Sequence, residues 1–462
     1  MNPLTDQFAI DDSSSIANAL EKITENKSGL VFIVDAKQKL IGCFSDGDYR
    51  SLSLNKNLNI DIKKDKVISY MNTDPKYIYF DQENSREALL NFFNTGFSII
   101  PVLDKKKRIK QILNKDNAFK GIPVLKRVFT KAPLRCSLAG GGTDLYEFYK
   151  DHDGAIISFS IKKYVYCLIE NSNAGIEIDC KDINLQINMK SILEIEEKIN
   201  EHPESELVLR VVKKYLKEDS IKISIWSDVS VGTGLAASTS LVVALINGLD
   251  KRYSIQRSRS LLAQEAFEIE RIHLNQDGGW QDQYLASYGG LNLIEFSEKK
   301  GNSIKKISLN KSQEGILESC LMLVNTNMSH DSKDQQKELL KSFDDKSKIE
   351  TLKTMTKRAK KLYDHLANGS IENLGMILHK NWELKKSSSS AISNKKIDDI
   401  YDQLREFGAI GGKLLGSGSG GFFIVYVNLA DAYNFKKKCL NNNFQVSDIK
   451  FDTKGARAWE IS

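Results

Sequence analysis

The chain contains 462 residues, of which 41% are hydrophobic and 27% are charged, and its formal net charge is +6. This apolar content supports hydrophobic cores and excludes an intrinsically disordered chain. The basic excess is weaker than the dense basic stripe that nucleic acid requires, so it predicts an anionic small molecule as the partner. The length predicts about three domains of roughly 150 residues each.

The six cysteines are scattered, without a CxxC pair or a Cys/His cluster of zinc spacing. This pattern predicts free thiols in a reducing compartment. Residues 1–10 are polar and contain no signal-peptide core, and no apolar run approaches the length of a membrane span. We therefore expect a cytoplasmic protein with no membrane partner.

The first 120 residues contain an internal repeat with a period of about 70 residues, which is too long for a simple solenoid and predicts two small modules that stack. In each copy a helix-like stretch precedes two apolar strands. The matching segments are the helices 16–23 and 85–93, the strands 30–35 and 99–104, and the strands 40–45 and 108–113.

The second strand of the first copy leads into Ser45-Asp-Gly-Asp48. The repeat thereby resembles a pair of cystathionine-β-synthase-type (CBS) modules, in which Ser/Thr-x-x-Asp holds an adenosine ribose or phosphate. In the second copy Asn114 and Asn117 stand at these places. The resemblance implies an adenine nucleotide at Ser45 and Asp48, and association into a homodimer. Alternatively, the two residues only cap the following helix, which both residue types do well.

Residues 115–128 are predicted to be a linker, because Gly121-Ile-Pro123 interrupts the periodicity. Beyond residue 129 the hydrophobic pattern mixes both kinds of element. Strands are expected at 164–169 and 221–226, and helices at 241–249, 261–271 and 351–365.

The segment 229–241, Val-Ser-Val-Gly-Thr-Gly-Leu-Ala-Ala-Ser-Thr-Ser-Leu, joins a predicted strand to a predicted helix. Its glycines let backbone N–H groups approach a ligand, and the helix N-terminus adds a partial positive charge that suits phosphate. The hydroxyls of Ser238, Thr239 and Ser240 can contact phosphate oxygens or a magnesium ion. The segment is neither a Walker A loop nor a Rossmann fingerprint, and such a helix start is structural about as often as it is functional.

Two further glycine-rich motifs accompany this loop, at 131–144 (ending Ala-Gly-Gly-Gly-Thr-Asp) and at 411–423. In this order the three motifs resemble the galactokinase–homoserine kinase–mevalonate kinase–phosphomevalonate kinase (GHMP) superfamily, over residues 129–462. The sequences of residues 139–144, 281–296 and 408–416 are similar to those of D-glycero-D-manno-heptose 7-phosphate kinases. Those enzymes phosphorylate the anomeric hydroxyl of a heptose 7-phosphate for nucleotide-heptose and surface-polysaccharide synthesis.

The resemblance implies an α+β, two-lobed GHMP kinase fold preceded by a small α/β CBS pair. The implied domains are a tandem CBS-like domain over 1–120, an ATP-binding domain over 126–312 and a C-terminal domain over 313–462. It also implies ATP and Mg²⁺ as cofactors and a sugar phosphate as the acceptor. The alternatives are a kinase for another sugar, such as a fucose-like or hexose 1-kinase, and a decayed kinase whose CBS pair senses a nucleotide.

Residue roles follow from the motif positions. Asp282 matches the carboxylate that orients or deprotonates the attacking hydroxyl, and Arg135 matches the basic residue between nucleophile and γ-phosphate. Phosphoryl transfer needs such alignment and charge neutralisation. Ser238 and Glu270 match the magnesium ligands. The implied ATP-binding residues are Gly232, Thr233, Gly234, Leu235, Ala236, Ala237, Ser238, Thr239 and Ser240. The implied substrate-binding residues are Gly141, Gly142, Thr143, Asp144, Gly416, Ser417 and Gly418.

Plainer interpretations stand beside these roles. Asp282 could be a solvated loop acid, Glu270 a surface charge, and Arg135 a structural ion-pair partner. The stretch 379–386 also resembles the heptose kinases and could supply the basic group that a substrate phosphate needs, although Trp382 fits a core position and Lys385–Lys386 a solvated face. Departures from the family pattern leave the sugar open; they are Ser230, Val231, Ala236, Ala237, Trp280, His330, Ser417 and Ser419.

Overall fold

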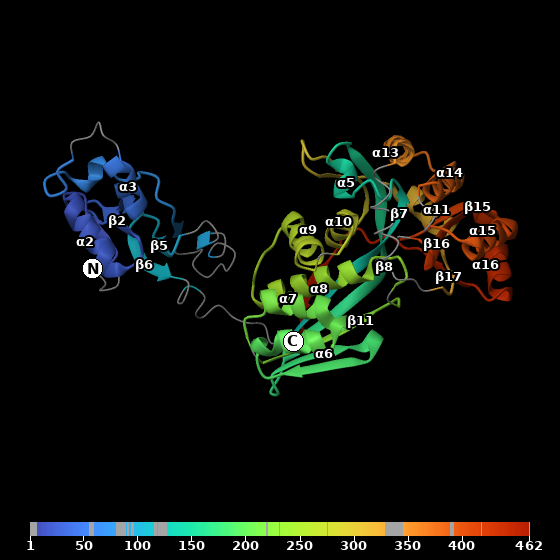
Figure 1. Ribbon diagram of the computed structural model, residues 1–462, viewed down its shortest axis with the longest axis horizontal. Coiled ribbons are helices and arrows are strands. Elements are labelled where there is room, and N and C mark those ends of the chain that lie inside the picture. The colour runs from blue at the N-terminus through green and yellow to red at the C-terminus, as the bar shows by residue number, and fades with distance from the viewer. Residues whose placement is uncertain are drawn as a thin grey trace. The chain divides into compact units, whose positions relative to one another are not determined.

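The computed structural model describes residues 7–54, 60–79, 89, 92–93, 97–114, 118, 127–218, 220–230, 232–274, 276–328, 345–388, 392–416 and 418–461. The chain forms two compact units, residues 1–124 with 253–256 and residues 125–252 with 257–462 (Figure 1). Within the described ranges, no helix is long and apolar enough to cross a membrane.

The first unit contains two three-stranded sheets of the same topology. In one, β1 (Ala9–Asp11) is parallel to β2 (Leu30–Val34), which is antiparallel to β3 (Leu40–Ser45). In the other, β4 (Ile78–Tyr79), β5 (Ile99–Leu103) and β6 (Ile109–Asn114) repeat this order and these directions. The sequence repeat therefore corresponds to a structural duplication. Most of the expected helix 85–93 lies outside the described residues.

Alternation along β2 divides its side chains between two cores, because successive residues of a strand face opposite sides. Val31 and Ile33 pack with buried residues of α2 (Ile16–Asn26), a helix that Ser15 and Asn18 close with a reciprocal capping box. Leu30 and Phe32 pack instead with Ile99, Leu103 and Ile112 of the other sheet. The two copies thus share one core, and α3 (Asp46–Leu54) follows β3 in the first copy.

The second unit is built around β8 (Gly154–Asn171), the central strand of an eight-stranded sheet. One edge of β8 pairs with β7 (Arg127–Ala139), and the other pairs with β12 (Leu291–Phe296) and then β11 (Ile221–Ser227). The remaining strands are β9 (Ile176–Cys180), β10 (Leu185–Met189), β13 (Ser303–Lys306) and β18 (Arg457–Glu460), the last of which pairs with β7. The strands expected at 164–169 and 221–226 are present.

Helix α8 (Ala237–Arg252) packs directly on β7 and β8. A Cβ at Gly248 would lie 2.6 Å from Thr130 Cγ2, so a glycine is required for this close approach. Figure 1 shows α7 (Glu206–Tyr215), α9 (Arg259–Phe267) and α10 (Gln281–Tyr288) grouped with α8. The expected helix 261–271 differs at its end, because residues Glu268–His273 form a π-helix.

A second, antiparallel sheet has the order β15-β16-β14-β17. Its strands are β14 (Leu321–Asn325), β15 (Ala409–Leu414), β16 (Phe422–Val427) and β17 (Gln445–Asp448). The accompanying helices are α11 (Lys311–Cys320), α13 (Lys346–Ala367), α14 (Leu374–Lys386), α15 (Lys395–Phe407) and α16 (Ala432–Asn441). The backbone of α14 lies against β15, since a Cβ at Gly411 would meet the Gly375 carbonyl oxygen at 2.0 Å. The expected α+β class is confirmed for this unit.

Candidate active site

The three glycine-rich motifs meet at one place in the second unit. A Cβ at Gly416 would lie 2.6 Å from Gly234 Cα, and a Cβ at Gly234 would lie 2.7 Å from the Leu415 carbonyl oxygen. Both glycines also have positive φ, 75° and 76°. Arg135 on β7 joins the first motif to the same point by donating from Nη1 to the Gly234 carbonyl at 2.6 Å. A side chain at either Gly234 or Gly416 would therefore hold these loops apart.

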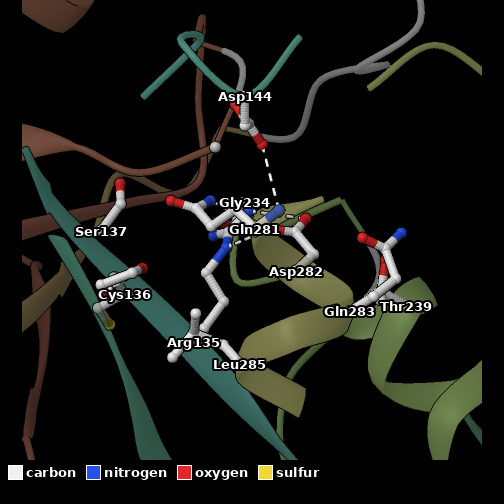
Figure 2. Close-up of polar contacts among 12 residues, drawn as sticks. Arg135, Cys136, Ser137, Asp144, Gly234, Thr239, Gln281, Asp282, Gln283 and Leu285 are labelled. Atoms are coloured by element: carbon white, nitrogen blue, oxygen red, sulfur yellow. Dashed lines mark hydrogen bonds and ion pairs between the residues drawn. The ribbon is translucent and has the colours of Figure 1, made fainter. Parts of the chain in front are cut away.

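Arg135 and Asp282 form a bidentate ion pair beside this junction (Figure 2). Nε donates to Oδ1 at 2.7 Å and Nη2 donates to Oδ2 at 3.0 Å. Asp282 lies in the first turn of α10, where a helix N-terminus favours a carboxylate. Burial alone would raise the pKa of Asp282, but the charge and hydrogen bonds of Arg135 outweigh it and hold that pKa below its usual value. Asp282 is thus a fixed, ionised side chain rather than a solvated loop acid.

Asp144 approaches the same helix N-terminus, and Figure 2 shows it pointing toward Gln281. Its Oδ2 accepts the Gln281 backbone N–H at 3.2 Å, and a Cβ at Gly279 would lie 2.1 Å from that oxygen. Burial and then the neighbouring Asp282 carboxylate raise the pKa of Asp144. Thr143 is fully buried and donates to the Gly140 and Ala155 carbonyls, so it shapes the loop that presents Asp144.

Glu270 is buried, with 1% of its surface exposed, which contradicts the surface-charge interpretation. It projects from the π-helix, a distortion that is frequent at functional sites. Thr239 Oγ1 donates to its two oxygens at 2.8 and 2.9 Å, and Gln283 Nε2 donates to Oε2 at 2.7 Å. Burial raises the pKa of Glu270, so a nearby cation would favour its ionised form.

The second glycine-rich motif leads into the N-terminus of α8. Ser238 is exposed there, whereas Ser240 is buried and donates to the Pro133 carbonyl at 2.9 Å. Ala236 adopts φ 64°, a left-handed conformation that costs about 1 kcal/mol outside glycine and that concentrates at ligand-binding turns. The structure thus presents Ser238 outward, while the hydroxyls of Thr239 and Ser240 have partners inside the protein.

A pocket lies beside the Arg135–Asp282 pair and gathers residues from the first and third glycine-rich motifs. Its lining residues are Arg135, Ser137, Gly141, Gly142, Asp144, Leu145, Arg271, Gly278, Gly279, Gln281, Asp282, Leu352, Lys385, Ser388, Ile392 and Gly416. Six residues that sequence reasoning singled out are among them. Gly418 lies close by, since a Cβ there would be 2.7 Å from Ile392 Cα. Ser417 lies outside the described residues.

Two lysines of this region were missed as site residues. Lys385, expected on a solvated face, is 8% exposed and donates to the Gly416 carbonyl at 2.7 Å. Burial and then the Arg135 charge lower the pKa of Lys385 to about 8. Lys413 is buried behind it and donates to Ser137 Oγ at 2.8 Å; burial, Lys385 and Arg135 hold its pKa well below the usual value. A glycine-rich neighbourhood was the only sequence signal for Lys413.

The other candidates of α14 are structural. Trp382 is fully buried in the core beside Phe423, as the plainer interpretation held. His379 Nδ1 is hydrogen-bonded to the Tyr401 hydroxyl at 2.8 Å. Lys386 forms ion pairs with Glu383 and Asp398 at 3.0 and 3.2 Å. Only Lys385 of this stretch lines the pocket.

In the first unit, Ser45 and Asp48 form a reciprocal cap. Ser45 donates from its backbone N–H and its hydroxyl to Asp48 Oδ2 at 2.8 and 2.7 Å, and the Asp48 N–H donates to Ser45 Oγ at 3.2 Å. The capping interpretation is therefore confirmed. It leaves the nucleotide prediction for this motif untested.

Comparison with protein families gives two matches in the second unit. Residues 206–290 match the GHMP kinases N terminal domain, and residues 362–445 match the GHMP kinases C terminal. A D-glycero-alpha-D-manno-heptose 7-phosphate kinase of Campylobacter jejuni is 30% identical over 341 residues, which cover 73% of this chain and all of the relative. A galactokinase of Thermotoga petrophila is 26% identical over 64% of this chain and 88% of its own length.

Solved structures of sugar kinases also superimpose on this chain. A D-glycero-D-manno-heptose 1-phosphate kinase from Bacteroides thetaiotaomicron superimposes with a TM-score of 0.59 at 26% identity, covering 72% of this chain and 99% of its own. A putative sugar kinase from Campylobacter jejuni has a TM-score of 0.57 at 27% identity, covering 73% and 99%.

Proposed function

The chain belongs to the GHMP kinase family and is an ATP-dependent sugar phosphotransferase, and on this premise we propose that it phosphorylates the anomeric hydroxyl of a heptose 7-phosphate. The observation that carries the proposal is the bidentate Arg135–Asp282 pair beside a pocket lined by the first and third glycine motifs. The two family matches fall inside the proposed ATP-binding domain 126–312 and the proposed C-terminal domain 313–462.

In this proposal Asp282 orients the attacking hydroxyl. A carboxylate whose pKa is held below its usual value is a weak base, which favours orientation over full proton abstraction in the ground state. Arg135 holds the Asp282 carboxylate in place and donates one further hydrogen bond to the Gly234 carbonyl. It therefore links Asp282, which would orient the attacking hydroxyl, to the loop that would bind the ATP phosphates. Its charge would then stabilise the transferring phosphoryl group.

The ATP phosphates would lie on the loop Gly232–Ser240, against the N-terminus of α8. Glu270 and Ser238 offer a carboxylate and a hydroxyl, the oxygen ligands that Mg²⁺ takes together with nucleotide phosphates. Glu270 Oε1 accepts one hydrogen bond in the structure and so keeps a free lone pair. Among the described residues, no three His, Cys, Asp or Glu side chains form a metal-binding group by themselves. Bound Mg²⁺ would supply charge neutralisation at the phosphates.

The acceptor would lie in the pocket, where Asp144 and the backbone of Gly141 and Gly142 meet Asp282. Asp144 is a buried acceptor suited to a sugar hydroxyl. The test is ATP consumption with matched pairs of acceptors, each sugar supplied with and without a terminal phosphate. Transfer to heptose 7-phosphate, with the product phosphate on the anomeric carbon by NMR, supports the proposal, and no transfer to any heptose phosphate refutes it.

A kinase for a free sugar is the second candidate. The galactokinase relatives favour it, and so does a bifunctional fucokinase/GDP-fucose pyrophosphorylase of Arabidopsis thaliana, 23% identical over 66% of this chain and 30% of its own length. The acceptor panel separates the two, because such an enzyme would prefer galactose or fucose over every sugar phosphate.

For the first unit we propose a CBS-type pair that binds an adenine nucleotide at Ser45 and Asp48 and associates into a homodimer. The duplicated sheet topology supports the pair. Calorimetry of AMP with the full chain should then show a site that Asp48→Asn removes while the kinase activity persists. Sedimentation would report the dimer.

A further inference from the structure

The pocket contains more positive charge than transfer to a neutral sugar would need. Once Arg135 is paired with Asp282, Arg271 and Lys385 remain as lining cations beside a single lining acid, Asp144. We infer that Arg271 binds the phosphate group that the acceptor already carries. This inference rests on the proposed function and identifies the residue that would select a phosphorylated acceptor.

The guanidinium of Arg271 is held in place but incompletely paired. Its Nη1 donates to the Asp277 carbonyl at 3.0 Å, while its Nε is buried without a hydrogen-bond partner. Among the described residues, no carboxylate lies within 4.0 Å of it as an ion-pair partner. A guanidinium that lines a pocket without a carboxylate partner keeps its charge available to an anionic ligand.

Glu270 and Arg271 face different parts of the site from the same helical turn. Glu270 and Arg271 are neighbours in it, yet Glu270 contacts Thr239 and Gln283 while Arg271 lines the pocket. The carboxylate therefore faces the side of the phosphate loop, and the guanidinium faces the side of the acceptor.

Two consecutive glycines place Arg271 next to Asp144. A Cβ at Gly278 would lie 2.7 Å from the Arg271 Cζ, and a Cβ at Gly279 would lie 2.1 Å from the Asp144 Oδ2. Gly278 thus leaves room for the Arg271 guanidinium, and Gly279 leaves room for the Asp144 carboxylate. Since Asp144 is the proposed partner of a sugar hydroxyl, Arg271 lies where a substituent of that sugar would reach.

Lys385 is placed differently. Its ammonium donates to the carbonyls of Gly416 and Leu414 at 2.7 and 3.5 Å, and Arg135 is near enough to lower its pKa. Those contacts belong to the junction of the glycine loops, where the γ-phosphate of ATP would lie. Lys385 therefore serves the donor, and Arg271 is the cation left for the acceptor.

The chemistry of the side chain fits this role. A guanidinium presents a planar fork of donors that matches a phosphate in two parallel hydrogen bonds, and it stays charged throughout the physiological pH range. A free sugar would leave the fork unpaired. The pocket would then discriminate against the unphosphorylated acceptor by the cost of that unmet charge.

The test compares Arg271→Gln and Arg271→Lys with the wild type, on heptose 7-phosphate and on the free heptose. For Arg271→Gln we expect KM for the phosphorylated acceptor to rise about 10- to 100-fold, the loss of one charge-assisted contact. The kcat/KM for the free heptose should change less than threefold. For Arg271→Lys, the KM for the phosphorylated acceptor should lie between the values of the wild type and of Arg271→Gln, because lysine keeps the charge but lacks the planar fork of donors.

Arg127→Gln provides the matched control, since Arg127 is half exposed and its guanidinium pairs with Glu170 on the sheet. Equal losses on both acceptors for Arg271→Gln and Arg271→Lys would make Arg271 structural and overturn the inference. So would an unchanged KM for heptose 7-phosphate in soluble, ATP-binding Arg271→Gln. A wild type that transfers only to unphosphorylated sugars would instead refute the proposed function, before any variant is made.

Discussion

Asp282→Asn isolates the charge of the proposed hydroxyl-orienting residue while keeping its size. The amide still offers one oxygen to Arg135, so one of the two hydrogen bonds at 2.7 and 3.0 Å survives. Breaking a buried ion pair outright costs about 3–5 kcal/mol. Because the Asp282 side chain is 20% exposed and keeps one bond, we expect a stability loss of about 2–3 kcal/mol.

The effect on catalysis should be larger than the effect on binding. We expect kcat to fall about 10²- to 10⁴-fold, the usual contribution of a positioned acid or base. The Kd for ATP should change little, because the proposal places Asp282 on the acceptor side of Arg135. A coupled ADP-release assay gives kcat and calorimetry gives Kd. Asp153→Asn, at a half-exposed carboxylate paired with Lys300, is the control. A soluble Asp282→Asn protein with full turnover would refute the role.

Three further predictions concern the loops and the cations. Glu270→Gln should raise the Mg²⁺ concentration for half-maximal rate about 10-fold or more, measured by magnesium titration; an unchanged titration would exclude Glu270 as a ligand. Gly416→Ala should abolish activity, because its Cβ would meet Gly234 Cα at 2.6 Å, whereas Gly301→Ala, with the same φ of 75° and open space, should lose only about 1 kcal/mol of stability. With Lys385 charged below a pKa of about 8, turnover should fall as pH rises through that value. In Lys385→Gln this fall should disappear, with a lower plateau at neutral pH; an unaltered profile would show that Lys385 does not act on the reaction.

The parts of the site that sequence reasoning anticipated are those encoded locally. Gly234 and Gly416 were expected in phosphate-binding loops, and both occupy positive-φ turns where only a glycine fits. Asp282 and Arg135 lay in motifs, and they pair in space. The internal repeat was visible because both copies keep a continuous apolar strand, Leu30–Val34 and Ile99–Leu103, whose residues are all buried.

The parts that sequence reasoning missed depend on tertiary context. Lys385 follows Leu384 and precedes Lys386 on one helix, and nothing local distinguishes the buried lysine from the paired, partly exposed one. Only the folded chain brings Lys385 to the Gly416 carbonyl and Lys386 to Glu383 and Asp398. Likewise, residues Glu268–His273 form a π-helix, which the ordinary helical pattern of residues 261–271 does not predict.

Arg135 explains why the three motifs must occur together in one chain. Its guanidinium holds the Asp282 carboxylate with two nitrogens and the Gly234 carbonyl with the third, so in the proposed mechanism one planar group would set the distance between acceptor and donor. Gly234 in turn touches Gly416, and Lys385 reaches the Gly416 carbonyl. In the proposed mechanism, a displacement of any one loop would therefore move the nucleophile relative to the phosphate. Since a misplacement of about 1 Å can cost 10²-fold in rate, these backbone contacts would matter to catalysis as much as the charged groups.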